Sequence, residues 1–192
     1  MKKEQLNNAI DASLKFQELM GGVFPTFIIG INTFIEESNN PAIGLTKDQS
    51  KNLMNGVLIV QLFSMWDTYF HKDIIGEDVV EKYFRPEEKE RFYAFKHIRH
   101  VFAHNLDGDR KGNKGNDKMR HDEKLDRMME SDGAIAGVEL DDFRIDLSNS
   151  NAALDCRQFL QDMAMKLAAG RFSVGGAYGK IKVSGGGETD IM

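Results

Sequence analysis

The segment KDQSKNLMNGVLIVQLFSMWDTYFHKDI (residues 47–74) is apolar on nearly every side when it is written as a helix. One apolar stripe recurs at intervals of three and four residues and consists of Met54, Val57, Leu58, Leu62, Met65, Trp66, Tyr69 and Phe70. A second stripe contains Val60 and Phe63. Thr46 is a favourable N-cap residue, and Asp48 lies in the first turn, where the helix dipole favours an acid. Because a helix that is apolar all round is buried by its neighbours, the segment predicts a long central helix in a helical bundle.

A second long helix is predicted to begin at Pro86 and to end at His104 or Asn105. Proline at the first position, followed by two glutamates, is typical of a helix start. Its apolar stripe consists of Phe92, Phe95, Ile98, Phe102 and Leu106. Asn105 and Gly108 are residue types that adopt the left-handed conformation in which helices often end.

The remaining segments predict further helices and one short hairpin. Residues 4–20 have helical spacing, and the glycines at 21 and 22 with Pro25 indicate either two helices or one interrupted helix. Residues 136–147 alternate around two aspartates and predict a short β-hairpin. A last helix, capped by Ser148 or Asn149, is expected to end near Gly170.

The predicted fold is therefore mainly α, an up-and-down bundle of four to five helices with one short β-hairpin. We expect residues 1–170 to form a single domain, since a chain of 192 residues with 41% hydrophobic content can bury a real core. Residues 171–192 are rich in glycine and are expected to form a flexible tail.

The net charge of −5 argues against a protein that coats nucleic acid through bulk electrostatics. The chain is nevertheless basic between residues 96 and 120, where Lys96, Arg99, Arg110, Lys111, Lys114, Lys118 and Arg120 outnumber Asp107, Asp109 and Asp117. Residues 107–118 are polar and glycine-rich, which is typical of a loop that orders on a ligand or is simply disordered. Any contact with nucleic acid is expected to be local to this region, and a solvated charged loop is the alternative.

The single cysteine, Cys156, excludes an intrachain disulfide framework and is typical of a reducing compartment. The first residues lack the apolar run of a signal peptide. The longest apolar stretch, residues 23–35, contains polar residues and is too short to span a bilayer. We expect a cytoplasmic protein without a membrane segment.

Arg99 and His104, separated by four residues, are suited to the chemistry of a phosphodiester. The planar guanidinium matches phosphate oxygens, and the imidazole exchanges protons near neutral pH. On a regular helix the two side chains are about 140° apart, so we expect irregular structure at the helix end to turn His104 back. Asp67 on the preceding helix is either a solvated carboxylate or a partner of Arg99 or His104.

Residues 46–108 resemble the HEPN domain family, in which a four-helix bundle carries an arginine, four to six variable residues and a histidine. Arg99, His104 and the following Asn105 match that motif, and Asp67 occupies the position of an acidic residue on the preceding helix. His100 departs from the pattern, since many members have asparagine or aspartate directly after the arginine. The resemblance implies a metal-independent endoribonuclease of a toxin or antiviral system. It also implies that two motifs meet in a homodimer and that a cognate antitoxin or sensor protein is a partner.

Under this resemblance Arg99 would stabilise charge on the phosphoryl oxygens and His104 would move a proton. Asn105 would orient the phosphate or the imidazole, and Asp67 would hold Arg99 or select the tautomer of His104. RNA would be bound by Lys96, His100, Arg110, Lys111 and Lys114. No cofactor is implied.

Three other interpretations remain open. His104 is also a favourable residue at a helix C-terminus, and Arg99 with Asp67 is also a plausible structural ion pair. A HEPN-like module without catalytic activity that binds RNA or a protein is the alternative function. His97, His100 and His104 share a helix face and, with Asp107, are a weak zinc candidate, but no second cluster of ligands accompanies them, and we predict no metal site.

Overall fold

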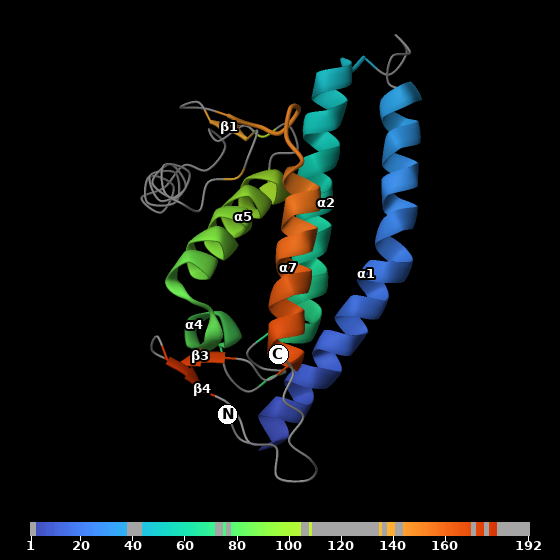
Figure 1. The fold of residues 1–192 in the computed structure, drawn as a ribbon. Coiled ribbons are helices and arrows are strands. Elements are labelled where there is room, and N and C mark those ends of the chain that lie inside the picture. Colours follow the sequence, from blue (N-terminus) through green and yellow to red (C-terminus); the bar gives the residue numbers. More distant parts are fainter. Residues whose placement is uncertain are drawn as a thin grey trace, which may run out of the picture.

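The computed structural model describes residues 3–37, 44–71, 75, 78–104, 108, 135, 138–140, 144–169, 172–174 and 177–179. The bundle is built from four long helices that run alternately up and down (Figure 1): α1 (Lys3–Glu37), α2 (Lys47–Phe70), α5 (Pro86–His104) and α7 (Ala152–Ala168). One short helix that we did not predict, α4 (Val79–Tyr83), precedes α5. The predicted fold class, a mainly helical bundle with a short hairpin, is confirmed.

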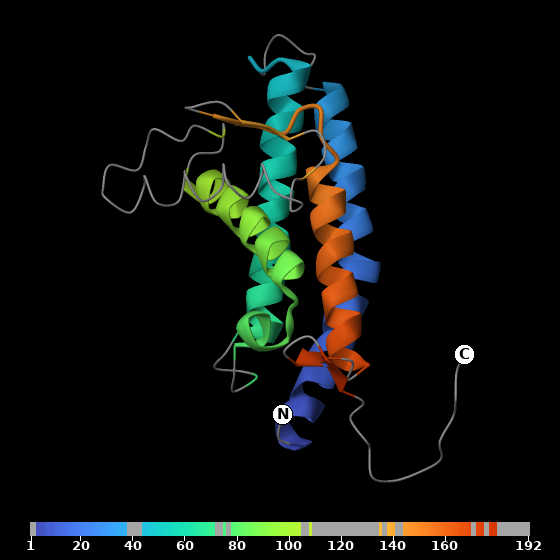
Figure 2. The same cartoon turned by 60° about the vertical axis from the view of Figure 1, so that its left-hand side comes forward.

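Helix α2 is the central element, as its sequence predicted, and it packs against α1, α5 and α7. In Figure 2, α5 leans across α2 while α1 and α7 stand alongside it. The predicted cap is confirmed, because Thr46 Oγ1 accepts from the Gln49 backbone N at 3.2 Å and Gln49 Oε1 accepts from Thr46 N at 2.8 Å. The helix ends at Phe70, before the expected end at Ile74, and residues 72–74 lie outside the described part.

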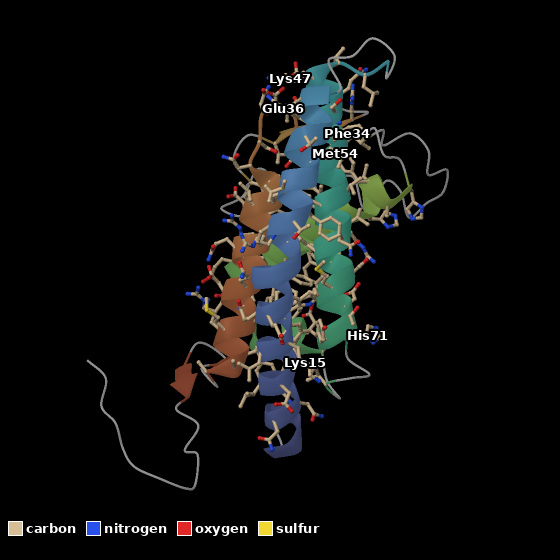
Figure 3. The ribbon with its side chains drawn as sticks, turned by 90° about the vertical axis from the view of Figure 1, so that its right-hand side faces the viewer. Lys15, Phe34, Glu36, Lys47, Met54 and His71 are labelled. Carbon is tan, nitrogen blue, oxygen red and sulfur yellow. The ribbon has the colours of Figure 1, made fainter. Side chains whose placement is uncertain are left out.

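Helix α1 corrects the expectation of two helices or an interrupted one, since a single helix runs from Lys3 to Glu37 with Pro25 inside it. One buried stripe runs along α1 on both sides of the proline. It contains Phe16, Met20 and Phe24 before Pro25, and Ile31 after it. Packing of that stripe outweighs the local helix breakers, because most helical stability in proteins comes from tertiary contacts. Figure 1 shows α1 changing direction along its length, and Figure 3 shows its C-terminal Glu36 at the same end of the bundle as Lys47.

Aromatic side chains form much of the core and join three of the long helices. The Trp66 and Phe70 rings stack with centroids 4.2 Å apart, and Phe16 of α1 meets Trp66 edge-on at 5.7 Å. Phe92 of α5 lies 5.3 Å from Phe63 of α2. Edge-to-face and offset contacts of this kind add to the stability from buried area. All of these rings belong to one continuous hydrophobic cluster.

In the part of the chain that the structure describes, two short antiparallel hairpins accompany the helices. The first pairs β1 (Glu139–Leu140) with β2 (Ile145–Asp146), within the predicted residues 136–147. The second pairs β3 (Phe172–Val174) with β4 (Ala177–Gly179), within the residues that are expected to form a flexible tail. Its strands flank a Gly-Gly dipeptide in the sequence, and that dipeptide favours a two-residue hairpin turn. The rest of the tail lies outside the described residues.

The cap of the last helix also differs from the prediction. The N-cap residue of α7 is Asn151, whose side chain makes no capping hydrogen bond, rather than Ser148 or Asn149. Ser150 Oγ accepts from Ala152 N at 3.3 Å and partly replaces that cap. No helix in the described part of the chain combines the length and hydropathy needed to cross a membrane.

Candidate functional site

A close approach between α2 and α5 positions the end of α5 that carries the candidate residues. A Cβ atom at Gly56 would lie 2.0 Å from Cδ1 of Phe102, whose ring is fully buried. Only glycine leaves room for the ring at this crossing. The glycine in the middle of an apolar helix was the sequence signal for this contact, and it was missed.

Gly108 holds the chain just beyond α5. Its φ of +81° is left-handed, as predicted, and its carbonyl accepts from Ile145 N at 3.0 Å. A Cβ at this position would lie 2.4 Å from the Ile145 carbonyl oxygen. The hairpin β1–β2 is therefore tied to the end of the candidate site. Asn105, the third residue of the predicted motif, lies outside the described residues.

Two asparagines of α2 attach the end of the hairpin to the bundle. Leu147 N donates to Oδ1 of Asn52 at 2.7 Å, and Nδ2 of Asn55 donates to Leu147 O at 3.0 Å. Asn52 is buried, so this bond also satisfies a polar group that would be costly to bury alone. Both side chains were missed in the sequence, because their partner lies far along the chain.

The predicted contact between Arg99 and Asp67 is present. Arg99 Nη2 lies 3.4 Å from Asp67 Oδ2, and the two side chains are 32% and 43% exposed. Among the described residues, the buried Nε of Arg99 has no hydrogen-bond partner. A half-exposed pair contributes little to stability, but it holds the guanidinium of α5 against a carboxylate of α2.

His104 lies beside His100 rather than beside Arg99. Both histidines are exposed, and their ring centroids are 4.8 Å apart at an interplanar angle of 69°. The spacing of four residues places them on one face of α5. His104 is the last residue of the helix, so the irregular turn that we expected before it is absent. Arg99 therefore faces α2, and the two imidazoles form a separate pair on the neighbouring surface.

Of the predicted RNA-binding residues, Lys96 and His100 lie in the described part, and both are exposed on α5. Lys96 Nζ lies 5.9 Å from the centroid of the Tyr93 ring. Burial and a hydrogen bond to the Glu81 carboxylate raise the pKa of Tyr93, which therefore stays a neutral donor. Arg110, Lys111 and Lys114 lie outside the described residues.

The opposite end of α5 carries a charge cluster that sequence reasoning missed. Glu88, whose side chain is 8% exposed, accepts from Arg85 Nη2 at 2.8 Å and from Lys166 of α7. The cluster lies in an open cleft of about 360 Å³ between α5 and α7, with Phe159 and Arg91 in its lining. Within the described ranges, no three His, Cys, Asp or Glu side chains gather closely enough to hold a metal ion.

No protein-family model, curated protein or solved structure matches this chain. The roles of the candidate residues are therefore argued from their chemistry and positions. The arrangement combines one oriented guanidinium with two exposed imidazoles at the end of α5. Such a set can bind a phosphate and exchange protons with it.

Proposed function

We propose that this protein is a metal-independent endoribonuclease with a HEPN-like motif. The observation that carries the proposal is the presence, in the C-terminal part of α5, of the Arg99–Asp67 ion pair and of the exposed pair His100 and His104 on the neighbouring surface. Arginine and histidine together supply the two functions that cleavage of RNA needs, charge stabilisation and proton transfer.

Arg99 would bind the phosphoryl oxygens and stabilise the charge that develops on them during attack by the 2′-hydroxyl. Asp67 would position the guanidinium, since it already contacts Nη2 of Arg99. The Nε of Arg99 is buried, so the phosphate would be bound by the terminal Nη atoms of this partly exposed side chain. The fork of donors suits a tetrahedral phosphate.

His104 would take or give the proton at the reacting oxygens, because it is exposed at the end of α5 and reachable by a polymeric substrate. Lys96 and His100 extend the basic surface along α5. The proposal further includes Asn105 as an orienting residue and Arg110, Lys111 and Lys114 as RNA contacts. A homodimer and a cognate antitoxin or sensor in a cytoplasmic defence system complete the proposal.

The alternative is a module without catalytic activity that binds RNA or a protein. It is favoured by one observation, namely that the charge of Arg99 is already matched by Asp67. In this case the pair is structural and His104 serves only as a favourable residue at a helix C-terminus.

Cleavage of total cellular RNA in EDTA by the full-length chain and three variants separates the two functions. We expect the wild type to leave 2′,3′-cyclic phosphate ends. Arg99→Ala and His104→Ala should lose roughly 100-fold to 10,000-fold in rate, the usual contribution of such groups. His71→Ala is the histidine control, since His71 is exposed just beyond the C-terminal end of α2 (Figure 3) and belongs neither to the Arg99–Asp67 pair nor to the His100–His104 pair.

Equal cleavage by the wild type and His104→Ala would contradict the mechanism and point to a contaminating nuclease. Absence of cleavage by the wild type would favour the binding module. Overexpression gives a second readout, since an active ribonuclease should arrest growth while its Arg99→Ala form should not.

A further inference from the structure

Cleavage of a phosphodiester by the adjacent 2′-hydroxyl needs two proton transfers. One group removes the proton of the 2′-hydroxyl, and another gives a proton to the departing 5′-oxygen. With His104 as the only proton-transfer group of each chain, the second would have to come from another copy. The ring contact between His100 and His104 offers a different source.

Both imidazoles belong to one helix of one chain and are open to solvent. Their ring centroids are 4.8 Å apart, and the rings meet edge-on at 69°, so the two rings present different edges to the same neighbouring surface. A single phosphodiester placed over α5 can therefore contact both rings. Each ring in its neutral form has one donor and one acceptor nitrogen, and its cation has two donors.

We propose that His100 and His104 of one chain are the general base and general acid of a single active site. This inference rests on the proposed ribonuclease function and adds His100 as a catalytic residue. One imidazole, neutral, takes the proton of the 2′-hydroxyl while the 2′-oxygen forms a bond to phosphorus. The bond between phosphorus and the 5′-oxygen breaks, and the other imidazole, as its cation, gives a proton to that oxygen.

The step balances without a metal or a co-reactant. It leaves a 2′,3′-cyclic phosphate and a 5′-hydroxyl, and the two imidazoles exchange their protonation states until water restores them. Along α5, the charged residues within about one turn before His100 are Lys96 and Arg99, and Arg99 is paired with Asp67 of α2.

A substrate with sulfur in place of the bridging 5′-oxygen tests the pair directly. A thiolate leaves without a proton, so a variant that lacks the general acid should regain activity on this substrate, and a variant that lacks the general base should not. The experiment compares ordinary and sulfur-bridged oligoribonucleotides with the wild type, His100→Gln and His104→Gln, and with His71→Gln as the histidine control.

On ordinary RNA we expect both site variants to lose about 100-fold or more in rate and His71→Gln to match the wild type. On the sulfur-bridged substrate, one of the two site variants should return to within about 10-fold of the wild type, and that variant identifies the acid. Circular dichroism should show all variants folded, since the three rings are exposed.

Wild-type activity in His100→Gln on ordinary RNA, with His104→Gln inactive, would overturn the pair while leaving the proposed ribonuclease intact. Rescue of both variants or of neither by sulfur would also overturn it, because the two histidines would then not divide the roles. Failure of the wild type to cleave either substrate would overturn the ribonuclease and the pair together.

Discussion

The two ends of α5 carry charged side chains in contrasting environments. At the N-terminal end, the carboxylate of Glu88 is 8% exposed and is bound by cations from its own helix end and from α7. At the C-terminal end, Arg99 and Asp67 are 32% and 43% exposed, and His100 and His104 face solvent. In the first set the carboxylate of Glu88 is enclosed by its two cations, which line an open cleft, while no charged side chain of the second set is buried.

The contrast separates charges that stabilise the fold from charges that are available for binding. Burial raises the pKa of Glu88, but the hydrogen bonds from Arg85 and Lys166 outweigh that effect and hold it below its ordinary value. The carboxylate is therefore ionised and satisfied within the protein. A ligand for the C-terminal end would meet side chains whose charges are only partly matched.

The largest expected effect comes from breaking the helix crossing that holds the C-terminal end in place. Gly56→Ala should lower the free energy of unfolding by about 3 kcal/mol, because the new methyl group would overlap the buried ring of Phe102. The gain in helix propensity, about 1 kcal/mol, does not compensate for this clash. Urea denaturation followed by circular dichroism measures the change.

Gly22→Ala is the matched control, since a Cβ atom there meets nothing within 4 Å. It should raise the free energy of unfolding by roughly 0.5–1 kcal/mol, the usual advantage of alanine inside a helix. If both variants were equally stable, the close crossing of α2 and α5 would not exist in solution.

Glu88→Gln tests the N-terminal end and should lower the free energy of unfolding by about 2 kcal/mol at neutral pH. The amide keeps the shape of the side chain but loses the charge that Arg85 and Lys166 bind. Cleavage of RNA, measured below the melting temperature, should be unaffected, because the cluster lies at the other end of α5.

The stability of the wild type and that of Glu88→Gln should depend differently on pH, and the sign of the difference follows from the lowered pKa of Glu88. A carboxyl with a lowered pKa in the folded protein stabilises it above the ordinary glutamate value of 4.5. That contribution is lost as the pH falls through the lower pKa of the folded state. The wild type should lose more stability than Glu88→Gln between neutral and acidic pH. Parallel curves would show that the carboxylate is not held by its two cations.

The smallest effect on stability is expected from Asp67→Asn. The change in free energy of unfolding should be below about 1 kcal/mol, because a half-exposed ion pair stabilises a fold only weakly. Under the proposed function, RNA cleavage should nevertheless fall, since the guanidinium loses the carboxylate that orients it. A loss of stability as large as that of Glu88→Gln, with cleavage retained, would make the pair structural.

The hydrophobic periodicity of the sequence predicted those helices in which the local residue preferences agree with the packing in the folded protein. The boundaries of α5, the cap of α2 and the position of the first hairpin followed from residue patterns alone. Helix α1 did not, because its proline and paired glycines argue for a break that packing along the whole buried stripe overrides. The β3–β4 hairpin was hidden by the high glycine content of the tail.

The same distinction holds for the candidate site. A carboxylate on an apolar helix suggested a partner for Asp67, and Arg99 was one of two candidates beside a solvated carboxylate. The contact between His100 and His104 follows from a spacing of four on a helix, a pattern that we interpreted as RNA binding or as a weak zinc candidate. The hydrogen bonds of Asn52 and Asn55 to the backbone of Leu147 join residues that are far apart in the sequence, so no local sequence pattern predicts them.

The hydrogen bond between Gly108 and Ile145 has a consequence for the evolution of the chain. The bond joins the two residues that flank residues 109–144, so the position of the end of α5 does not depend on the length of that segment. The entropy of closing a loop grows only with the logarithm of its length. Insertions and deletions between these two anchors would therefore cost the bundle little in loop-closure entropy, so the length of this segment can vary among descendants of the same scaffold.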